Sequence, residues 1–345
     1  MSLPPSEIPQ GAIRFNTDSQ KLEFYAQGEW WVMSTDTPNL GVGADTTAGA
    51  RGVFGSGTTP GNSNTLDYIN IASTGNAVTF GGLVFQIQGA SGSASSSTRG
   101  LWAGGQNPLD GNIQYITISS TGNSVDFGAD LTRSNRFVAG ASNETRACFG
   151  GGLNSTDVID YVTIASTGVA AQDFGNLVTP RGQCGSCASP TRGIFAGGHA
   201  HPAPSNSIQV IDFITISSLG DAQDFGDLID LNAEDIVGAS NTIRGIFAGG
   251  NPAGGASQNN IQFITIATLG NAQNFGDLNT GATSKGGVAS PTRAVFAGGY
   301  TNPGSTMTDA IDYVTIMTQG NAVDFGDLTA ARDQLNGVSN AHGGL

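Results

Sequence analysis

The chain has 345 residues and a formal charge of −14, which disfavours nucleic acid as a partner because an acidic surface repels a phosphate backbone. Glycine accounts for 52 residues and charged residues for only 12%, a composition typical of short strands joined by tight turns and not of a disordered chain. There is no apolar run approaching about eighteen residues and no basic, apolar leader after Met1, so we expect neither membrane insertion nor a signal peptide.

Three short strand-like runs come first in the chain, at residues 12–16, 21–25 and 29–33. They mix aromatic and aliphatic residues with polar ones, and they are separated by Thr-Asp-Ser-Gln and Gln-Gly turns. Runs of this kind, bounded by turn residues, predict three strands.

A repeated pattern fills the rest of the chain, in which an arginine precedes a small, an apolar and an aromatic residue and then a glycine-rich end. Each copy is followed by a β-branched run such as 211–216, a glycine turn, a run ending in Phe-Gly, and a short run of small residues such as 236–240. The copies recur every 46 to 52 residues and begin at Arg51, Arg99, Arg146, Arg192, Arg244 and Arg293.

Four short strands per unit at this period predict an all-β fold, a β-propeller of four-stranded blades. The small-residue strand is expected to be innermost, because strands crowd at the centre. The glycine doublet at 249–250, with Phe263 and Phe275 on the next two strands, resembles the kelch repeat. The resemblance covers about residues 40–340, departs in having Phe where kelch repeats usually have Trp, and implies the propeller fold.

The two ends of the chain bear on the number of blades. Residues 335–339 form a lone small-residue strand, and Trp31 precedes Phe80 by 49 residues, which is one period. We therefore predict a single domain over residues 1–345, with seven blades favoured and the last blade made of 12–33 together with 335–339. Six blades plus a separate N-terminal module is the alternative.

The N-terminal segment carries a second resemblance. Residues 11–31, which begin Gly-Ala-Ile-Arg-Phe-Asn and end Trp-Trp, are similar to a segment common in bacteriophage tail-fibre and other virion proteins, especially those of marine and cyanobacterial phages. Those proteins also carry repeats like residues 191–198 and 321–328. The resemblance implies a virion structural protein of a fibre, baseplate or neck, made in the host cytoplasm.

The repeated arginines are expected to serve the fold. We predict that each closes the turn before its strand and pairs with a carboxylate on the fourth strand, at Asp126, Asp173, Asp224 or Asp324.

The histidines and cysteines predict neither a metal site nor a redox site. His199 and His201 could approach one metal ion, but the remaining histidine, His342, is in the C-terminal tail, so no metal is expected. Cys184 and Cys187 have the C-x-x-C spacing without its usual context and are predicted to be small core residues. There is no phosphate-binding loop and no plausible catalytic triad, so we predict no enzyme, no catalytic residue and no cofactor.

The loops between the second and third strands vary, whereas the turns at the opposite edge are nearly uniform. The lengths of these loops between the second and third strands range from six residues at 153–158 to twelve at 199–210. Variable loops on a rigid scaffold commonly carry recognition. We therefore predict a contact surface centred on loops 199–210, 251–260 and 300–310. Its candidate binding residues are His199, His201, Asn251, Asn260, Tyr300 and Asn302.

These observations favour a non-enzymatic phage virion protein that docks to other virion proteins or attaches to a host cell-surface glycan or receptor. A stand-alone glycan-binding lectin or adhesin is the alternative. A polysaccharide-degrading propeller is less favoured, because the repeats offer a single irregular acidic pair, Glu234-Asp235, for acid–base chemistry.

Overall fold

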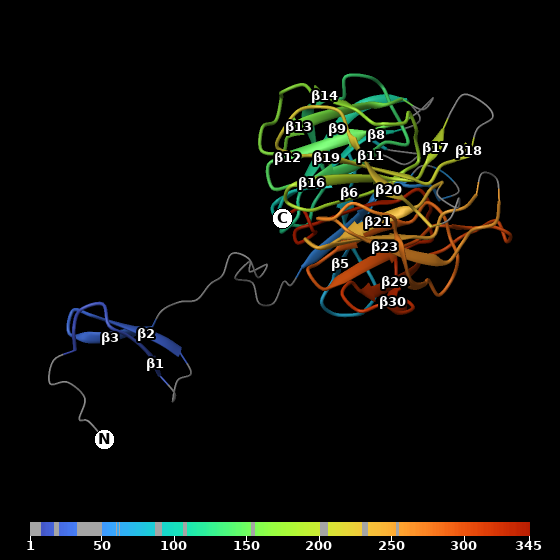
Figure 1. Cartoon of the computed structure of the whole chain (residues 1–345). Coiled ribbons are helices and arrows are strands. Elements are labelled where there is room, and N and C mark those ends of the chain that lie inside the picture. Colours follow the sequence, from blue (N-terminus) through green and yellow to red (C-terminus); the bar gives the residue numbers. More distant parts are fainter. Residues whose placement is uncertain are drawn as a thin grey trace. The chain divides into compact units, whose positions relative to one another are not determined.

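The computed structural model describes residues 8–16, 21–32, 50–59, 61, 63–86, 92–105, 109–152, 156–200, 206–229, 234–252 and 255–345. These residues form strands and turns without helices, so the all-β prediction is confirmed, and they include no helix that could cross a membrane. The chain divides into two compact units, Met1–Thr47 and Ala48–Leu345, instead of the single domain that we expected (Figure 1).

The N-terminal unit contains one antiparallel sheet of three strands, β1 (Ile13–Asn16), β2 (Lys21–Ala26) and β3 (Glu29–Val32). Gln27 and Gly28 both have positive φ, 55° and 85°, in the two-residue turn between β2 and β3. Such a turn matches the twist of a hairpin, so β2 pairs with β3, and β1 pairs with the other edge of β2.

The described part of the large unit contains six four-stranded antiparallel sheets, arranged in the manner of a β-propeller. Sheet 1 is β31 (Asn336–Ser339), β4 (Arg51–Gly55), β5 (Thr65–Asn70) and β6 (Val78–Gly82). Sheet 2 is β7 (Gly92–Ser95), β8 (Arg99–Gly105), β9 (Asp110–Thr117) and β10 (Val125–Asp130), and sheet 3 is β11 (Ala139–Ser142), β12 (Arg146–Gly150), β13 (Val158–Thr163) and β14 (Gln172–Asn176).

The other three sheets repeat this order. Sheet 4 is β15 (Gly185–Ala188), β16 (Arg192–Ala196), β19 (Val210–Thr215) and β20 (Gln223–Asp227). Sheet 5 is β21 (Val237–Ser240), β22 (Arg244–Ala248), β23 (Asn260–Thr265) and β24 (Gln273–Asp277), and sheet 6 is β25 (Gly286–Ala289), β26 (Arg293–Ala297), β29 (Ala310–Thr315) and β30 (Val323–Asp327). Two hairpins lie outside them, β17 (His199–Ala200) with β18 (Asn206–Ser207), and β27 (Tyr300–Thr301) with β28 (Thr306–Met307).

The pairing expected between residues 12–33 and 335–339 is wrong. Strand β31 pairs with β4, with Val338 opposite Val53, and completes sheet 1. Strands β1–β3 form their own sheet and pair with none of the described strands of the large unit. Strands β2 and β3 are joined by a two-residue turn and form a local sheet with β1, whereas β31 takes the free edge of β4.

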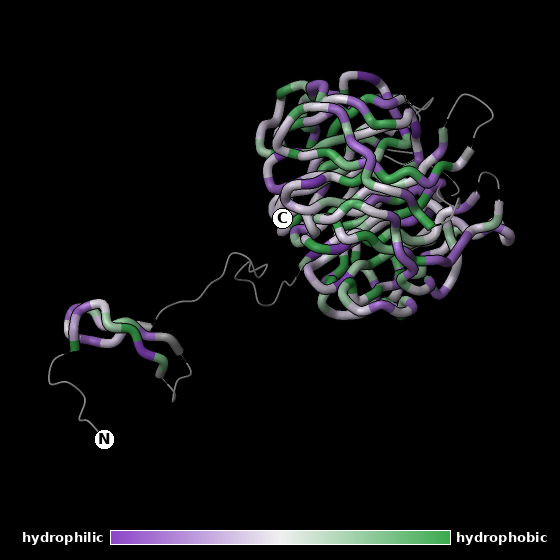
Figure 2. Tube along the Cα trace, in the orientation of Figure 1, coloured by the Kyte–Doolittle hydropathy of each residue, from purple (hydrophilic) through white to green (hydrophobic). Residues whose placement is uncertain are grey.

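The hydrophobic core lies between successive sheets. Phe225 of sheet 4 is 2% exposed and packs with Phe247, Ile264 and Ile266 of sheet 5. Equivalent clusters surround Phe80, Phe127, Phe174, Phe275 and Phe325. These aromatic residues therefore lie between neighbouring sheets, and hydrophobic stretches alternate with hydrophilic ones along the large unit (Figure 2).

The first strands of the six sheets lie innermost, each in contact with the first strand of the sheets on both sides. Their small residues are needed for this approach. A Cβ at Gly140 of β11 would collide with the backbone of Ser93 in β7, so glycine is required there.

The repeated arginines link the sheets, but not through carboxylates. The guanidinium of Arg192 lies 4.6 Å above the ring of Phe213 in its own sheet, and its Nη1 donates to the carbonyl oxygen of Ile266 in sheet 5, at 2.7 Å. The other five arginines make the same two contacts, and Arg293 of sheet 6 reaches Ile71 of sheet 1.

The expected pairing of these arginines with fourth-strand carboxylates is therefore wrong. The ion pairs among the described residues include none between a repeat arginine and Asp126, Asp173, Asp224 or Asp324. These aspartates lie on the exposed side of their strands, whereas each guanidinium is stacked on an aromatic ring at the sheet boundary.

A buried polar residue at one position of each third strand joins that sheet to the preceding one. In sheet 1 it is Asp67, whose carboxylate accepts from Thr329 Oγ1 at 2.8 Å and pairs with Arg332 Nη2 at 2.7 Å. Both side chains of this ion pair are fully buried. The same position holds Gln114 in sheet 2 and Gln262 in sheet 5.

Candidate functional site

The candidate surface is formed by the loops that leave the second strands of sheets 4, 5 and 6. In sheets 4 and 6 these loops form the β17–β18 and β27–β28 hairpins, the first of which projects from one side of the large unit (Figure 1). Each loop begins at a glycine doublet with positive φ, such as Gly197 (66°) and Gly198 (104°). This conformation favours glycine and turns the chain out of the strand.

All three loops are anchored in the same way. Their first residues form single β-bridges to the segment before an inner strand, in the pairs Gly182–His199, Glu234–Asn251 and Thr283–Tyr300. Sheet 1 has an equivalent bridge between Thr58 and Asp333. The scaffold therefore fixes the base of each loop and leaves the rest of the loop free to differ in sequence.

The loops of sheets 5 and 6 contact each other directly. The backbone N–H of Asn302 donates to Ser257 Oγ at 2.9 Å, and the backbone N–H of Ser257 donates to the backbone carbonyl of Asn302 at 2.7 Å. Asn302 Nδ2 also donates to the Gly255 carbonyl at 2.9 Å. Two loops from different repeats are thus held as one surface.

The loop of sheet 4 contacts sheet 5 through a different pair. His199 Nδ1 lies 3.1 Å from Glu234 Oε2, and Glu234 in turn bridges to Asn251. The structure therefore brings His199 and Asn251 together through Glu234, and places Tyr300 and Asn302 on the neighbouring loop. Asn260 begins β23 at the base of its loop, and His201 lies outside the described residues.

A row of polar residues that the sequence did not reveal precedes the inner strands. Gln183, Asp235, Ser284 and Gln334 have positive φ between 54° and 58°, although none is glycine. The Asp235 N–H donates to the Gln183 carbonyl, and the Ser284 N–H to the Asp235 carbonyl, both at 3.0 Å. The residue types differ between repeats, so only their shared place before each small-residue strand could have marked them.

Asp235 is the acidic residue of this row. Burial, together with the nearby Glu234 carboxylate, raises the pKa of Asp235 to about 6. Its Oδ1 accepts a hydrogen bond from Gln183 Nε2 at 3.1 Å, which offsets part of this effect.

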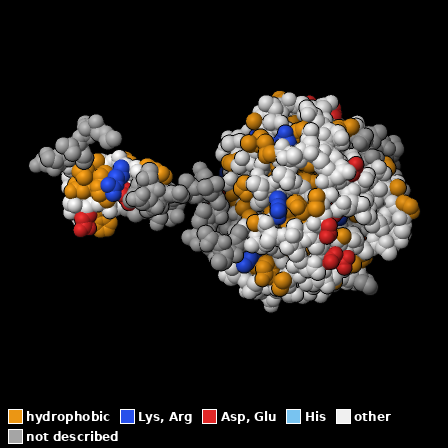
Figure 3. All heavy atoms as spheres, turned by 90° about the horizontal axis from the view of Figure 1, so that it is seen from below, with side chains coloured by type: hydrophobic (Ala, Val, Ile, Leu, Met, Phe, Trp, Pro, Cys, Tyr) orange, Lys and Arg blue, Asp and Glu red, His pale blue; other side chains and the backbone are white. Residues whose placement is uncertain are grey.

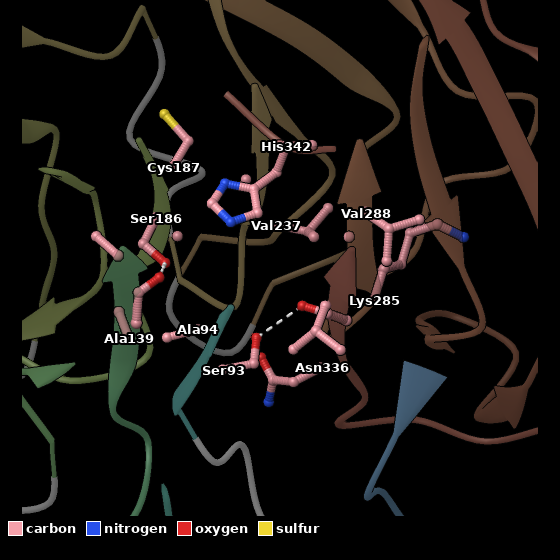
Figure 4. A pocket seen from close by; sticks show the side chains of 18 of the residues that line it. Ser93, Ala94, Ala139, Ser186, Cys187, Val237, Lys285, Val288, Asn336 and His342 are labelled. Atoms are coloured by element: carbon pink, nitrogen blue, oxygen red, sulfur yellow. Dashed lines mark hydrogen bonds between the residues drawn. The ribbon is translucent and has the colours of Figure 1, made fainter. Parts of the chain in front are cut away.

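All six inner strands line a central cavity of about 120 Å³ (Figure 4). Small residues line this cavity, and their hydroxyl groups form hydrogen bonds between neighbouring sheets. Ser93 Oγ donates to the Gly337 carbonyl, and Ser186 Oγ donates to the Gly140 carbonyl. The Lys285 side chain points away from the cavity and donates from Nζ to the Gly298 carbonyl. Its burial lowers the pKa of Lys285 to about 8.

The C-terminal segment lies across one end of this cavity. The ring of His342 points into it, with Nε2 at 2.9 Å from the Ser95 carbonyl oxygen and Nδ1 accepting from the Gly344 N–H at 3.0 Å. The Gly343 N–H donates to the Ser240 carbonyl. This arrangement requires the neutral imidazole, and burial lowers the pKa of His342.

The cysteines behave as structural residues. Cys148 and Cys187 are buried in the clusters between sheets, and burial raises the pKa of each thiol to about 12. Cys184 packs partly against the cluster that contains Cys148. In the part of the chain that the structure describes, no group of three or more His, Cys, Asp or Glu residues could hold a metal ion.

No protein-family model matches the sequence, and no curated protein matches it.

Proposed function

We propose that the six sheets of the large unit are the blades of a closed six-bladed β-propeller. Three kinds of contact between sheets 6 and 1 support this proposal. Phe325 packs against Ile69 and Ile71, Arg293 donates to the Ile71 carbonyl, and Arg332 pairs with Asp67. The same kinds of contact recur between other successive sheets, which is what a ring of equivalent blades requires.

We further propose that the chain is a non-enzymatic structural protein of a bacteriophage particle, and that the loop edge of sheets 4 to 6 binds a virion protein or the host surface. The similarity of residues 11–31 to tail-fibre segments supports the virion assignment. The observation that carries the binding role is the hydrogen-bonded pair of loops at Ser257 and Asn302. A repeated scaffold holds these varied loops in one place, as recognition by several loops requires.

The chemistry of this edge limits its partner. Its side chains are amides, hydroxyls, an imidazole beside a carboxylate, and the half-buried ring of Tyr300. Such groups suit a polar protein surface or a glycan, with the tyrosine ring as a contact for an apolar face.

The test replaces residues 200–207, 252–258 and 301–307 with short Gly/Ser turns and keeps the anchoring residues His199, Asn251 and Tyr300. The expected result is at least a tenfold loss of incorporation into particles or of adsorption to host cells, with the melting temperature nearly unchanged. A matched control replaces the exposed turns at 217–221 and 267–271 on the opposite edge. Normal incorporation and adsorption of the loop variant would contradict the proposal.

A further inference from the structure

The N-terminal sheet has two faces of very different character. On one face, the side chains contact one another. Arg14 pairs with Glu23 at 2.8 Å and lies 4.1 Å above the ring of Trp30, which packs edge-on against Tyr25. Glu23 is 6% exposed as a result. This face supplies the internal contacts of the unit.

The opposite face is apolar and uncovered. The register places Ile13 opposite Phe24 and Phe24 opposite Trp31, and Phe15 is two residues along β1 on the same side. These residues are 63%, 36%, 49% and 58% exposed for Ile13, Phe24, Trp31 and Phe15. Glu29, the charged residue on this side, lies at its margin beside the β2–β3 turn. Apolar side chains cover much of the visible surface of this unit (Figure 3).

A sheet of this size needs a partner for such a face. Domains of fewer than about 40 residues usually need disulfides, metals or oligomerisation, because they bury too little apolar surface. The free cysteines are Cys148, Cys184 and Cys187, all in the large unit, so they do not staple this sheet. A single sheet has no second layer against which its apolar face could be buried, so it lacks a core of its own.

We propose that this apolar face packs against the same face of a second copy of the chain, so that the N-terminal sheets form a two-layered β-sandwich between copies. The face is apolar and uncharged at its centre, so two copies can meet there without bringing like charges together. The four side chains expose on the order of 400 Å² per copy, or about 800 Å² for a pair, which is the size of a weak interface.

In the described part of the large unit, the exposed apolar residues Val78, Val125 and Val323 each begin the fourth strand of a different sheet, so the repeat spreads these three around the unit. Scattered residues of this kind are ordinary on a protein surface, whereas a contiguous patch indicates an interface.

The experiment measures the mass of the full chain in solution by light scattering after size-exclusion chromatography. We expect twice the 35.0 kDa of one chain at micromolar concentration. The double variant Ile13→Thr with Phe15→Thr, which places β-branched residues of high strand propensity at both positions of β1, should be monomeric. The control variant Val78→Thr with Val323→Thr removes similarly exposed apolar groups from the large unit and should keep the mass of the unmodified protein.

A second measurement decides the matter even if the double variant fails to fold. Burial of Trp31 between copies should shift the tryptophan emission of the unmodified protein to longer wavelength on dilution, as the copies separate. A monomeric mass for the unmodified protein, or an oligomer that survives in a folded double variant, would overturn the proposal. Neither outcome depends on what the loop edge of the large unit binds.

Discussion

The buried ion pair between Arg332 and Asp67 offers a direct test of how sheet 6 is joined to sheet 1. Arg332 donates from Nη2 to Asp67 at 2.7 Å and from Nη1 to the Thr65 carbonyl at 2.7 Å, with both charged side chains fully buried. The substitution Arg332→Met keeps the length and apolar volume of the side chain but leaves the Asp67 carboxylate with Thr329 alone.

The expected cost is large for a single substitution. Removing one partner of a buried ion pair costs about 3–5 kcal/mol, because the remaining charge stays buried without compensation. Adding Asp67→Asn should recover at least about 1 kcal/mol, since a neutral amide needs no counter-charge. Gln114 and Gln262 occupy the equivalent positions of sheets 2 and 5, so an amide is compatible with this site.

Urea unfolding followed by circular dichroism measures these differences, provided that the slope with denaturant stays constant. Arg133→Met is the matched control, because Arg133 Nη1 donates to Thr156 Oγ1 at an exposed site and its loss should cost no more than about 0.5 kcal/mol. If Arg332→Met costs as little as Arg133→Met, or if Asp67→Asn makes the Arg332→Met protein less stable, the buried pair does not hold these sheets together.

Three further predictions concern the core, the inner strands and the C-terminal segment. Phe225→Ala should lower the free energy of unfolding by about 3–5 kcal/mol, whereas Val323→Ala, at a residue 53% exposed, should change it by less than about 0.5 kcal/mol; equal effects in urea unfolding would refute the packing argument. Gly140→Ala should prevent a cooperative thermal transition, and a variant that melts like the unmodified protein would show that the inner strands can separate. In the folded chain, burial lowers the pKa of His342 below its ordinary value of 6.5. The unfolded chain therefore takes up the proton at a higher pH than the folded chain does. As a result, stability falls as the pH drops below about 6.5. The Gly344 amide, which bonds to His342, should therefore lose protection from hydrogen exchange between pH 7 and pH 5, and unchanged protection would contradict this reasoning.

Much of the local structure followed from the sequence because its causes are local. Alternation of β-branched and polar residues predicts strands, and a repeat of 46 to 52 residues predicts equivalent sheets. The burial of Phe225 and its equivalents was predictable for the same reason, because a residue that recurs at one place in every repeat has the same surroundings in each.

The candidate loops were also visible in the sequence, as departures from the repeat. Their mutual contacts were not, because the hydrogen bonds between Asn302 and Ser257 depend on how two loops from different repeats are placed. The positive φ of Gln183 and Gln334 was hidden as well, since glutamine does not signal that conformation.

The sequence by itself determined the four main strands of each repeat, their order and the burial of the repeated aromatic residues. The tertiary structure alone decided which distant segment completes sheet 1, and which groups the repeat arginines contact. Strand β31 pairs with β4 across some 280 residues. Arg192 contacts an aromatic ring and a backbone carbonyl, and not the fourth-strand carboxylate that the sequence suggested. Both outcomes depend on the energies of alternative long-range pairings, and a local pattern of residues does not contain those energies because they arise only when the sheets are packed against one another.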